Sequence, residues 1–263
     1  MTQRVPPPPS DSPSSLPLPP PDAWTGRILN DEARDSGCLQ AWWLDAYGTY
    51  RTTLEQRDYP CFFGQTAERR GEMFYAFCEA GDEETLRATM RRFVEVGREA
   101  ARVRFSLALF FAPDPSLTTH EEFLKRFWHA LQTLHDADGA PMAPAHPDDP
   151  LWEFSFGGRK MFVVGTSPTY RQRRSRVVGD GMVLLFQPRE LFTDPETGEP
   201  ISAAVRRQIH ARMLAYDGMP VHPDIGFYGD PDNREWKQYC LSDDNTPETG
   251  VCPFAPRPGS GNG

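Results

Sequence analysis

Apolar residues recur at helical spacing in four parts of the chain, and each part predicts a helix. These parts are residues 39–56, residues 83–102, the stretch that follows Thr118, and residues 201–216. Asp82 is expected to cap the second helix, and Thr118 and Glu121 have the spacing of a capping box at the start of the third.

Apolar residues of three of these helices share one face, which predicts the side that packs against the core. They are Trp43, Ala46, Tyr47 and Tyr50 in the first helix, Phe123, Phe127, Leu131 and Leu134 in the third, and Ile201, Val205, Ile209 and Leu214 in the fourth. His129 and His135 lie on the third helix and are expected at its surface or its end rather than as metal ligands.

Short stretches rich in Val, Leu and aromatic residues predict a sheet. They are residues 105–111, 152–156, 159–165 and 182–187, and Gly157-Gly158 joins the second and third of them by a hairpin-type turn. Helices grouped around such strands, without regular alternation, predict an α+β fold. We expect a single domain with a mainly antiparallel sheet and helices packed around it.

The two ends of the chain differ in composition from the middle. Nine of the 27 prolines fall within residues 6–21, and proline blocks both helix and sheet. Residues 1–22 are therefore expected to form a disordered tail, and residues 255–263 a second flexible tail. The folded domain is expected to span residues 23–254.

Charge and apolar content exclude several classes of protein. Lys and Arg total 28 against 37 Asp and Glu, a formal net charge of -9, so neither nucleic acid nor an anionic membrane is an expected partner. The longest apolar stretch, residues 106–112, is far shorter than the roughly 18–20 residues that span a bilayer. Without a signal peptide pattern at its start, the chain is expected in the cytoplasm.

Several common sites are excluded because their spacing is absent from the sequence. It contains no phosphate-binding GxxxxGK[ST] loop, no HExxH or ExxH metal motif, and no GxSxG nucleophile elbow. The five cysteines form no CxxC pair, which argues against a disulfide framework and a thiolate zinc site.

Two segments contain a residue that could bind a metal. Cys61 lies in YPCFFG between a rigid proline and two aromatic rings, followed by Gly64, which allows another group to approach closely. His222 lies between two prolines and is presented stiffly, as an axial metal ligand would be. A buried structural cysteine and a structural histidine are the alternative interpretations.

Two further clusters carry charge. His146, Asp148, Asp149 and Glu153 surround Trp152; they would suit a metal ion or a guanidinium or ammonium group, with ordinary turn chemistry as the alternative. Arg171, Arg173, Arg174 and Arg176 fall within six positions of an acidic protein. They would suit anions such as a substrate carboxylate or the propionates of a haem, with a solvated basic face as the alternative.

Five strings of the sequence together resemble the YqcI/YcgG family: YPCFFG, DPLWEFSFGGRKMFVVGTSPTYRQRRSR, VLLFQPRE, VHPDIGFYGDPDNREWKQY and VCPF. They keep their order over most of residues 59–254. The resemblance implies a haem-dependent N-oxygenase of natural-product biosynthesis, with haem b as cofactor. Its expected substrate is the guanidino or amino nitrogen of a free amino acid, and its oxidant is dioxygen with an external electron donor, or peroxide.

The resemblance also gives the candidate residues expected roles. Cys61 or His222 would be the axial ligand of the haem iron, with Cys252 ranked third. Arg171, Arg174 and Arg176 would bind the cofactor's propionates and Arg173 the substrate carboxylate. Asp148, Asp149 and Glu153 would hold the cationic end of the substrate, and Glu153 and Trp152 are the candidate catalytic residues.

Two alternatives remain open at this point. One is a non-haem metal-dependent oxygenase that uses His146, Asp148 and Glu153. The other is a haem-binding sensor or carrier without enzymatic activity, in which both axial positions are taken, for example by Cys61 and His222.

Overall fold

The computed structural model describes residues 24–31, 39–99, 105–140, 144, 146–193 and 202–254. The predicted tails, residues 1–22 and 255–263, lie outside these residues, and so does Ile201. Within the described residues, no helix combines the length and the apolar character that crossing a membrane requires.

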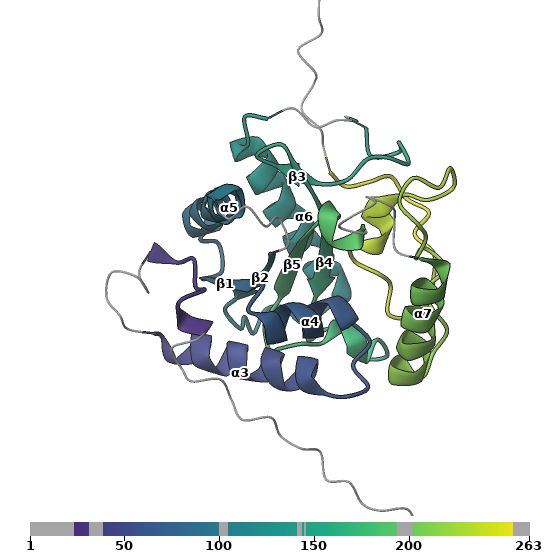
Figure 1. Ribbon diagram of the computed structural model, residues 1–263, viewed down its shortest axis with the longest axis horizontal. Coiled ribbons are helices and arrows are strands. Elements are labelled where there is room, and N and C mark those ends of the chain that lie inside the picture. Colours follow the sequence, from purple (N-terminus) through teal and green to yellow (C-terminus); the bar gives the residue numbers. More distant parts are fainter. Residues whose placement is uncertain are drawn as a thin grey trace, which may run out of the picture.

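A five-stranded sheet with the order β1-β2-β5-β4-β3 forms the centre of the structure (Figure 1). The strands are β1 (Met73–Cys78), β2 (Ser106–Phe111), β3 (Ser155–Phe156), β4 (Arg159–Thr166) and β5 (Val183–Pro188). β1 and β2 pair in parallel, and every other neighbouring pair is antiparallel. The sheet is therefore mixed but mostly antiparallel, which confirms the predicted α+β class.

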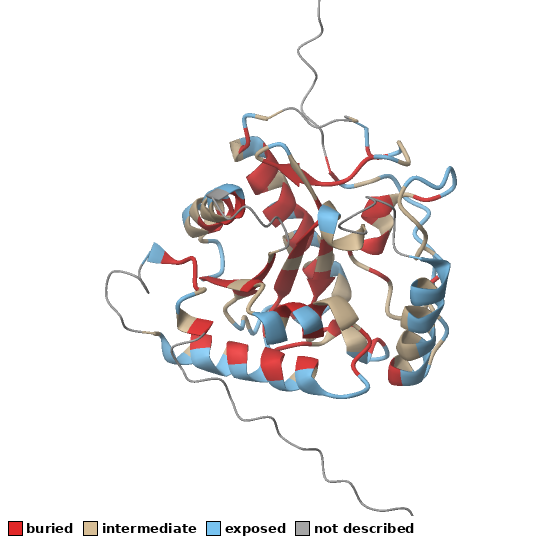
Figure 2. Cartoon of the chain, in the orientation of Figure 1, coloured by how far each residue is buried: buried red, intermediate tan, exposed pale blue. Residues whose placement is uncertain are grey.

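Helices cover both faces of the sheet. They are α3 (Ala41–Glu55), α4 (Phe62–Arg70), α5 (Glu83–Glu99), α6 (His120–Ala137) and α7 (Ala203–Asp217). Neighbouring residues of β1 face opposite sides: Tyr75 and Phe77 pack with α3, whereas Ala76 packs with α5 and α6. Because both faces are covered, β2 and β5 are buried along almost their whole length rather than at alternate residues (Figure 2).

Several local predictions are confirmed. Phe123, Phe127, Leu131 and Leu134 of α6 are fully buried, as their spacing predicts. Gly157 and Gly158 both have positive φ, 61° and 76°, and join β3 to β4. The capping box of α6 is present one residue later than predicted, at Thr119 and Glu122.

The predicted inward face of α7 is wrong at two of its four positions, whereas Ile209 lies on the inner side. Val205 and Leu214 are exposed, and Tyr216 is the one buried residue of this helix. Polar contacts hold α7 instead: the Asp217 carboxylate accepts hydrogen bonds from the N–H and hydroxyl of Ser175, at 2.7 and 2.8 Å. The sequence pattern also failed to predict β1 and α4.

We predict that Gly165→Ala destabilises the protein, because β4 and α6 approach each other closely at this residue. A Cβ there would lie 2.6 Å from Sγ of Cys240 and 2.8 Å from the ring of Phe127. We expect the free energy of unfolding, measured in urea, to fall by about 1–3 kcal/mol.

The matched control is Gly48→Ala on α3, where a new methyl group would meet nothing within 4 Å. The higher helix propensity of alanine should raise the free energy of unfolding by about 0.5–1 kcal/mol. Equal effects of the two substitutions would contradict the close approach at Gly165.

Candidate functional site

A cavity of about 220 Å³ lies on the α3 and α4 side of the sheet. Its floor comes from β4 and β5, and its walls from the end of α3, the start of α4, and α7. Most of the lining is aromatic or aliphatic, including Phe63, Phe162, Phe192 and Met213. Such a cavity suits a flat apolar ligand that is oriented by a few polar groups.

Cys61 lies at one wall of this cavity as the N-cap of α4. Its Sγ accepts a hydrogen bond from the N–H of Gly64 at 3.2 Å. A Cβ at residue 64 would lie 3.3 Å from that sulfur, so glycine leaves room beside it. Because a helix start carries free N–H groups and partial positive charge, it favours a thiolate.

The ionisation of Cys61 depends on opposing influences. Burial raises the pKa of the thiol, whereas N–H groups at the start of α4 and the guanidinium groups of Arg176 and Arg212 act in the opposite direction. The thiol therefore keeps its proton at neutral pH, and a bound metal ion would replace that proton.

Arg176 lines the same cavity from the end of the 3-10 helix η1 (Arg174–Arg176). Its Nη1 donates to the carbonyls of Gly165 at 3.2 Å and Tyr239 at 2.9 Å, and its Nη2 donates to Gln238 O at 3.0 Å. These acceptors are backbone carbonyls, which solvate the charge without neutralising it. The cavity thus contains a fixed positive charge that favours an anionic group.

Tyr50 contributes a polar atom to the cavity lining. It is fully buried, and the described residues provide no hydrogen-bond partner for its hydroxyl. Because buried polar groups are nearly always paired, this hydroxyl is a candidate donor to a molecule that enters the cavity. The sequence pattern identified Tyr50 only as a core residue of a helix.

Glu153 is buried outside the cavity and has a partner within the chain. Arg189 donates through both Nε, at 2.8 Å, and Nη2 to its carboxylate, and Nη2 also donates to Oε1 of Glu235 at 2.5 Å. The ring of Tyr228 covers this guanidinium group at 4.0 Å. Two carboxylates thus share one cation, which occupies the place that the sequence analysis assigned to a cationic substrate.

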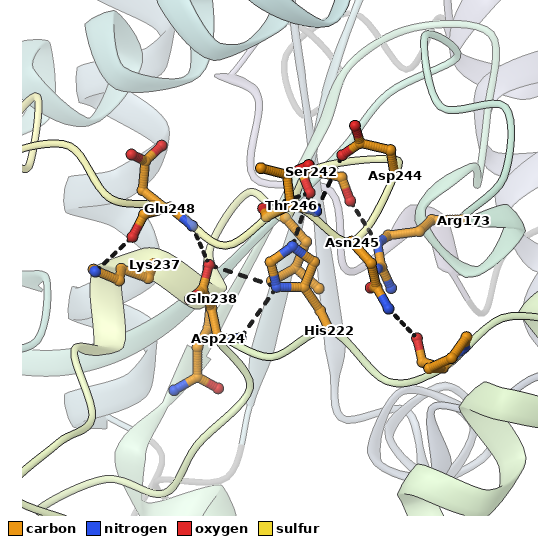
Figure 3. Close-up of polar contacts among 12 residues, drawn as sticks. Arg173, His222, Asp224, Lys237, Gln238, Ser242, Asp244, Asn245, Thr246 and Glu248 are labelled. Carbon is orange, nitrogen blue, oxygen red and sulfur yellow. Dashed lines mark hydrogen bonds and ion pairs between the residues drawn. The ribbon is translucent and has the colours of Figure 1, made fainter.

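Arg173 and His222 form a second buried network, apart from the cavity lining (Figure 3). Arg173 donates to the carbonyl of Ser242 at 2.7 Å and to the side chain of Asn245. His222 Nε2 lies 2.9 Å from the Ser242 hydroxyl, and the N–H of Asp224 donates to its Nδ1 at 3.2 Å. Both ring nitrogens are engaged, so this histidine holds loops together in the structure.

The other predicted residues are dispersed. Asp148 and Asp149 lie in a surface loop, where His146 Nδ1 is 3.6 Å from Asp148 Oδ2. Arg171 is exposed, and Arg174 stacks on the ring of Tyr216 at 4.8 Å.

Two predicted residues lie in the core on the α6 side of the sheet. Trp152 is fully buried there, and Cys252 packs against the same cluster with a thiol pKa that burial raises to about 12. Of the predicted residues, the structure brings only Cys61 and Arg176 into the described cavity. No three His, Cys, Asp or Glu side chains in the described ranges are arranged to hold a metal ion.

Comparison with known proteins places the chain in a family. The profile of the YqcI/YcgG family matches residues 50–255. The chain belongs to the YqcI/YcgG family. Its match begins at Tyr50 and includes both Cys61 and Arg176, so the whole cavity lining lies within the region shared with the family.

Curated relatives match this YqcI/YcgG protein over most of their length. "Uncharacterized protein YqcI" of Bacillus subtilis is 32% identical over 227 residues, which cover 82% of this chain and 89% of the relative. "Putative N(omega)-hydroxy-L-arginine synthase DcsA" of Streptomyces lavendulae is 31% identical over 226 residues, covering 82% and 85%. No solved structure matches the chain.

We predict that Tyr50→Phe leaves the ligand-free protein as stable as the wild type or more stable by about 1 kcal/mol, because it removes an unpaired buried hydroxyl. The control is Tyr47→Phe on the same helix, whose hydroxyl donates to Glu68 at 2.9 Å. This change should cost about 1–2 kcal/mol. Urea unfolding of both variants measures the difference, and a large loss in Tyr50→Phe would show that the hydroxyl has a partner.

We predict that Glu153 makes this YqcI/YcgG protein less stable as the pH rises from about 4.5 to 7. Burial raises the pKa of its carboxyl from 4.5 to about 7, and Glu235 adds to the shift while Arg189 opposes it. The folded state then binds more protons than the unfolded state in this range. The loss of stability is on the order of 3 kcal/mol and is complete above pH 7.

Glu153→Gln should remove this part of the pH dependence while keeping the shape of the side chain. Urea unfolding midpoints at pH 5 and pH 8 measure it in both proteins. An identical difference between the two pH values in wild type and variant would contradict the prediction.

Proposed function

We propose that this protein is a haem-dependent N-hydroxylase that acts on the guanidino or amino nitrogen of a free amino acid. The observation that carries the proposal is the cavity in which the Cys61 sulfur lies at a helix start, with Arg176 in the same lining. The name of the Streptomyces lavendulae relative makes arginine the first substrate to test.

The residues of the cavity fit haem in their chemistry. The cysteine sulfur, which accepts a backbone hydrogen bond, could bind the iron. The aromatic walls suit a flat ring, and the buried guanidinium group suits its anionic substituents. The volume of about 220 Å³ is below the roughly 300–1,000 Å³ typical of ligand pockets. Flexible side chains on α7, such as Met213, would therefore have to shift outward to admit a ring of this size.

Each residue of the cavity then has a role. Cys61 would bind the iron as thiolate, and the N–H of Gly64 would orient its sulfur. Arg176 would neutralise the thiolate or a propionate, and Tyr50 would donate a hydrogen bond to the bound ligand or substrate. The apolar walls would exclude water from the reacting nitrogen. Haem supplies the activation of dioxygen, with electrons from a separate donor, or of peroxide.

The geometry is less favourable to the two alternative functions. A non-haem metal site would need His146, Asp148 and Glu153 together, whereas the Glu153 carboxylate is bound by Arg189 on the interior side. A sensor with Cys61 and His222 as its two axial ligands would need the histidine in the cavity. Both nitrogens of His222 are engaged elsewhere, and this residue is not part of the cavity lining.

The test is the absorption spectrum of protein produced with a haem precursor and then titrated with L-arginine and L-lysine. We expect a Soret band that shifts with one of them, and a hydroxylated amino acid detected by mass spectrometry when a reductant or peroxide is added. Cys61→Ser should lose the thiolate spectrum, whereas Cys252→Ser, which alters a thiol outside the cavity, should keep it.

Two results would overturn the proposal. The absence of a Soret band in folded, haem-supplied protein would exclude haem as the cofactor. A spectrum that neither amino acid shifts, with both axial positions taken, would favour the sensor or carrier.

A further inference from the structure

The α7 helix contacts the loop of Cys61 through Tyr216, whose ring packs edge-on against that of Tyr59 with 5.5 Å between centroids, and through Arg212. Arg212 Nη2 donates hydrogen bonds to the carbonyls of Arg57, at 3.0 Å, and Tyr59. The same guanidinium group lies over the ring of Phe62, 4.2 Å from its centroid. Arg212 therefore contacts the chain on both sides of Cys61, through backbone before it and a side chain after it.

These contacts suit a guanidinium group and would not suit an ammonium group. Its plane can stack on an aromatic ring while its N–H groups donate in that plane, whereas lysine carries a compact charge that cannot do both. Other contacts also hold the loop: Tyr59 Oη donates to Ser175 O at 3.1 Å, and Gln65 Nε2 donates to Gln56 O at 2.9 Å. Neither of them brings a positive charge to the cysteine.

The weak apolar packing of α7 gives these contacts further weight. The helix buries only Tyr216, so it gains little from the hydrophobic effect. Its inner side carries Ile209 and Met213 in the cavity lining, and Arg212 lies between them in the sequence. The same helix therefore covers the cavity with Ile209 and Met213 and contacts the loop of Cys61 with Arg212.

We propose that Arg212, whose guanidinium group fixes the chain on both sides of the sulfur, is a positioning residue for Cys61. The inference rests on the proposed function in assigning Cys61 as the reactive or metal-binding group of the cavity. It adds that α7, a segment more than 140 residues further along the chain, governs the reactivity of this thiol.

The experiment measures how fast iodoacetamide alkylates Cys61 in the ligand-free full-length chain as a function of pH. Peptide mass spectrometry separates Cys61 from the other cysteines. The midpoint of the pH profile reports the pKa of the thiol, and the limiting rate at high pH reports its accessibility. The ionisable groups that interact with Cys61 are Tyr50, Tyr59, Arg176 and Arg212, and all of them except Arg212 stay unchanged.

Arg212→Gln should move the profile to higher pH and lower the thiolate fraction at pH 7.5 roughly three- to tenfold, a shift of about half to one pH unit. Arg212→Lys keeps the charge but loses the stacking on Phe62 and the hydrogen bonds to the two carbonyls. Its limiting alkylation rate should therefore rise, while the midpoint of its pH profile should move less than that of Arg212→Gln. The control is Arg206→Gln, since Arg206 stacks on Phe227 at 3.7 Å on the same helix. It should match the wild type.

A profile for Arg212→Gln and Arg212→Lys equal to that of the wild type in both midpoint and limiting rate would overturn the inference. If Arg212→Gln does not fold, as judged by circular dichroism, the inference is tested by Arg212→Lys alone: a limiting alkylation rate equal to that of the wild type would overturn it. A haem spectrum that survives in Cys61→Ser would instead overturn the iron-ligand assignment and leave an altered Arg212 profile standing. Loss of that spectrum in Cys61→Ser, together with alkylation profiles of the Arg212 variants equal to the wild type, would support the iron-ligand assignment and overturn the inference about Arg212.

Discussion

The buried guanidinium group of Arg176 is the constraint on which the candidate site depends. It joins three parts of the chain that are distant in sequence: the end of β4 at Gly165, its own 3-10 helix, and the carbonyls of Gln238 and Tyr239. A cation placed inside a protein is costly unless dipoles or anions surround it. Here carbonyl dipoles surround it and leave its charge available to the cavity. Replacing Arg176 would remove the hydrogen bonds that hold these three parts together, and it would also remove the positive charge from the cavity.

Charge inside this protein is arranged in separate networks, which explains why the charged clusters of the sequence do not form one pocket. The four arginines near residue 174 lie in a loop and one short helix, and such turns send neighbouring side chains to different sides. Arg173 enters the network of His222, Arg176 enters the cavity, and Arg171 stays at the surface. Glu153 meets Arg189, which is distant in sequence. Linear clustering therefore indicated that these residues matter without showing which of them meet.

Helical periodicity predicted most elements because each amphipathic face packs on a single core, as α6 shows. It did not find β1, MFYAFC, which is buried on both faces in the same way as β2 and β5 and, like them, has no alternation to detect; β2 and β5 were predicted from their content of apolar residues instead. It failed on part of the inner face of α7 because polar contacts hold that helix, and two residues of its apolar stripe, Val205 and Leu214, stay exposed. In the site, Cys61 was found from its unusual neighbours. Tyr50 was not, because its unpaired hydroxyl is a property of the folded core and looks in sequence like any aromatic residue of a helix.

Three groups in the cavity lining cost free energy in the ligand-free state. They are the hydroxyl of Tyr50, which has no partner among the described residues, the guanidinium group of Arg176, which donates to backbone carbonyls, and the buried thiol of Cys61. Such costs persist where a ligand repays them, because binding then satisfies groups that folding alone cannot. The three groups are a donor, a cation and a thiol. In the function proposed above, one ligand would engage all three: it would accept the hydrogen bond, place negative charge near the cation and replace the proton of the cysteine.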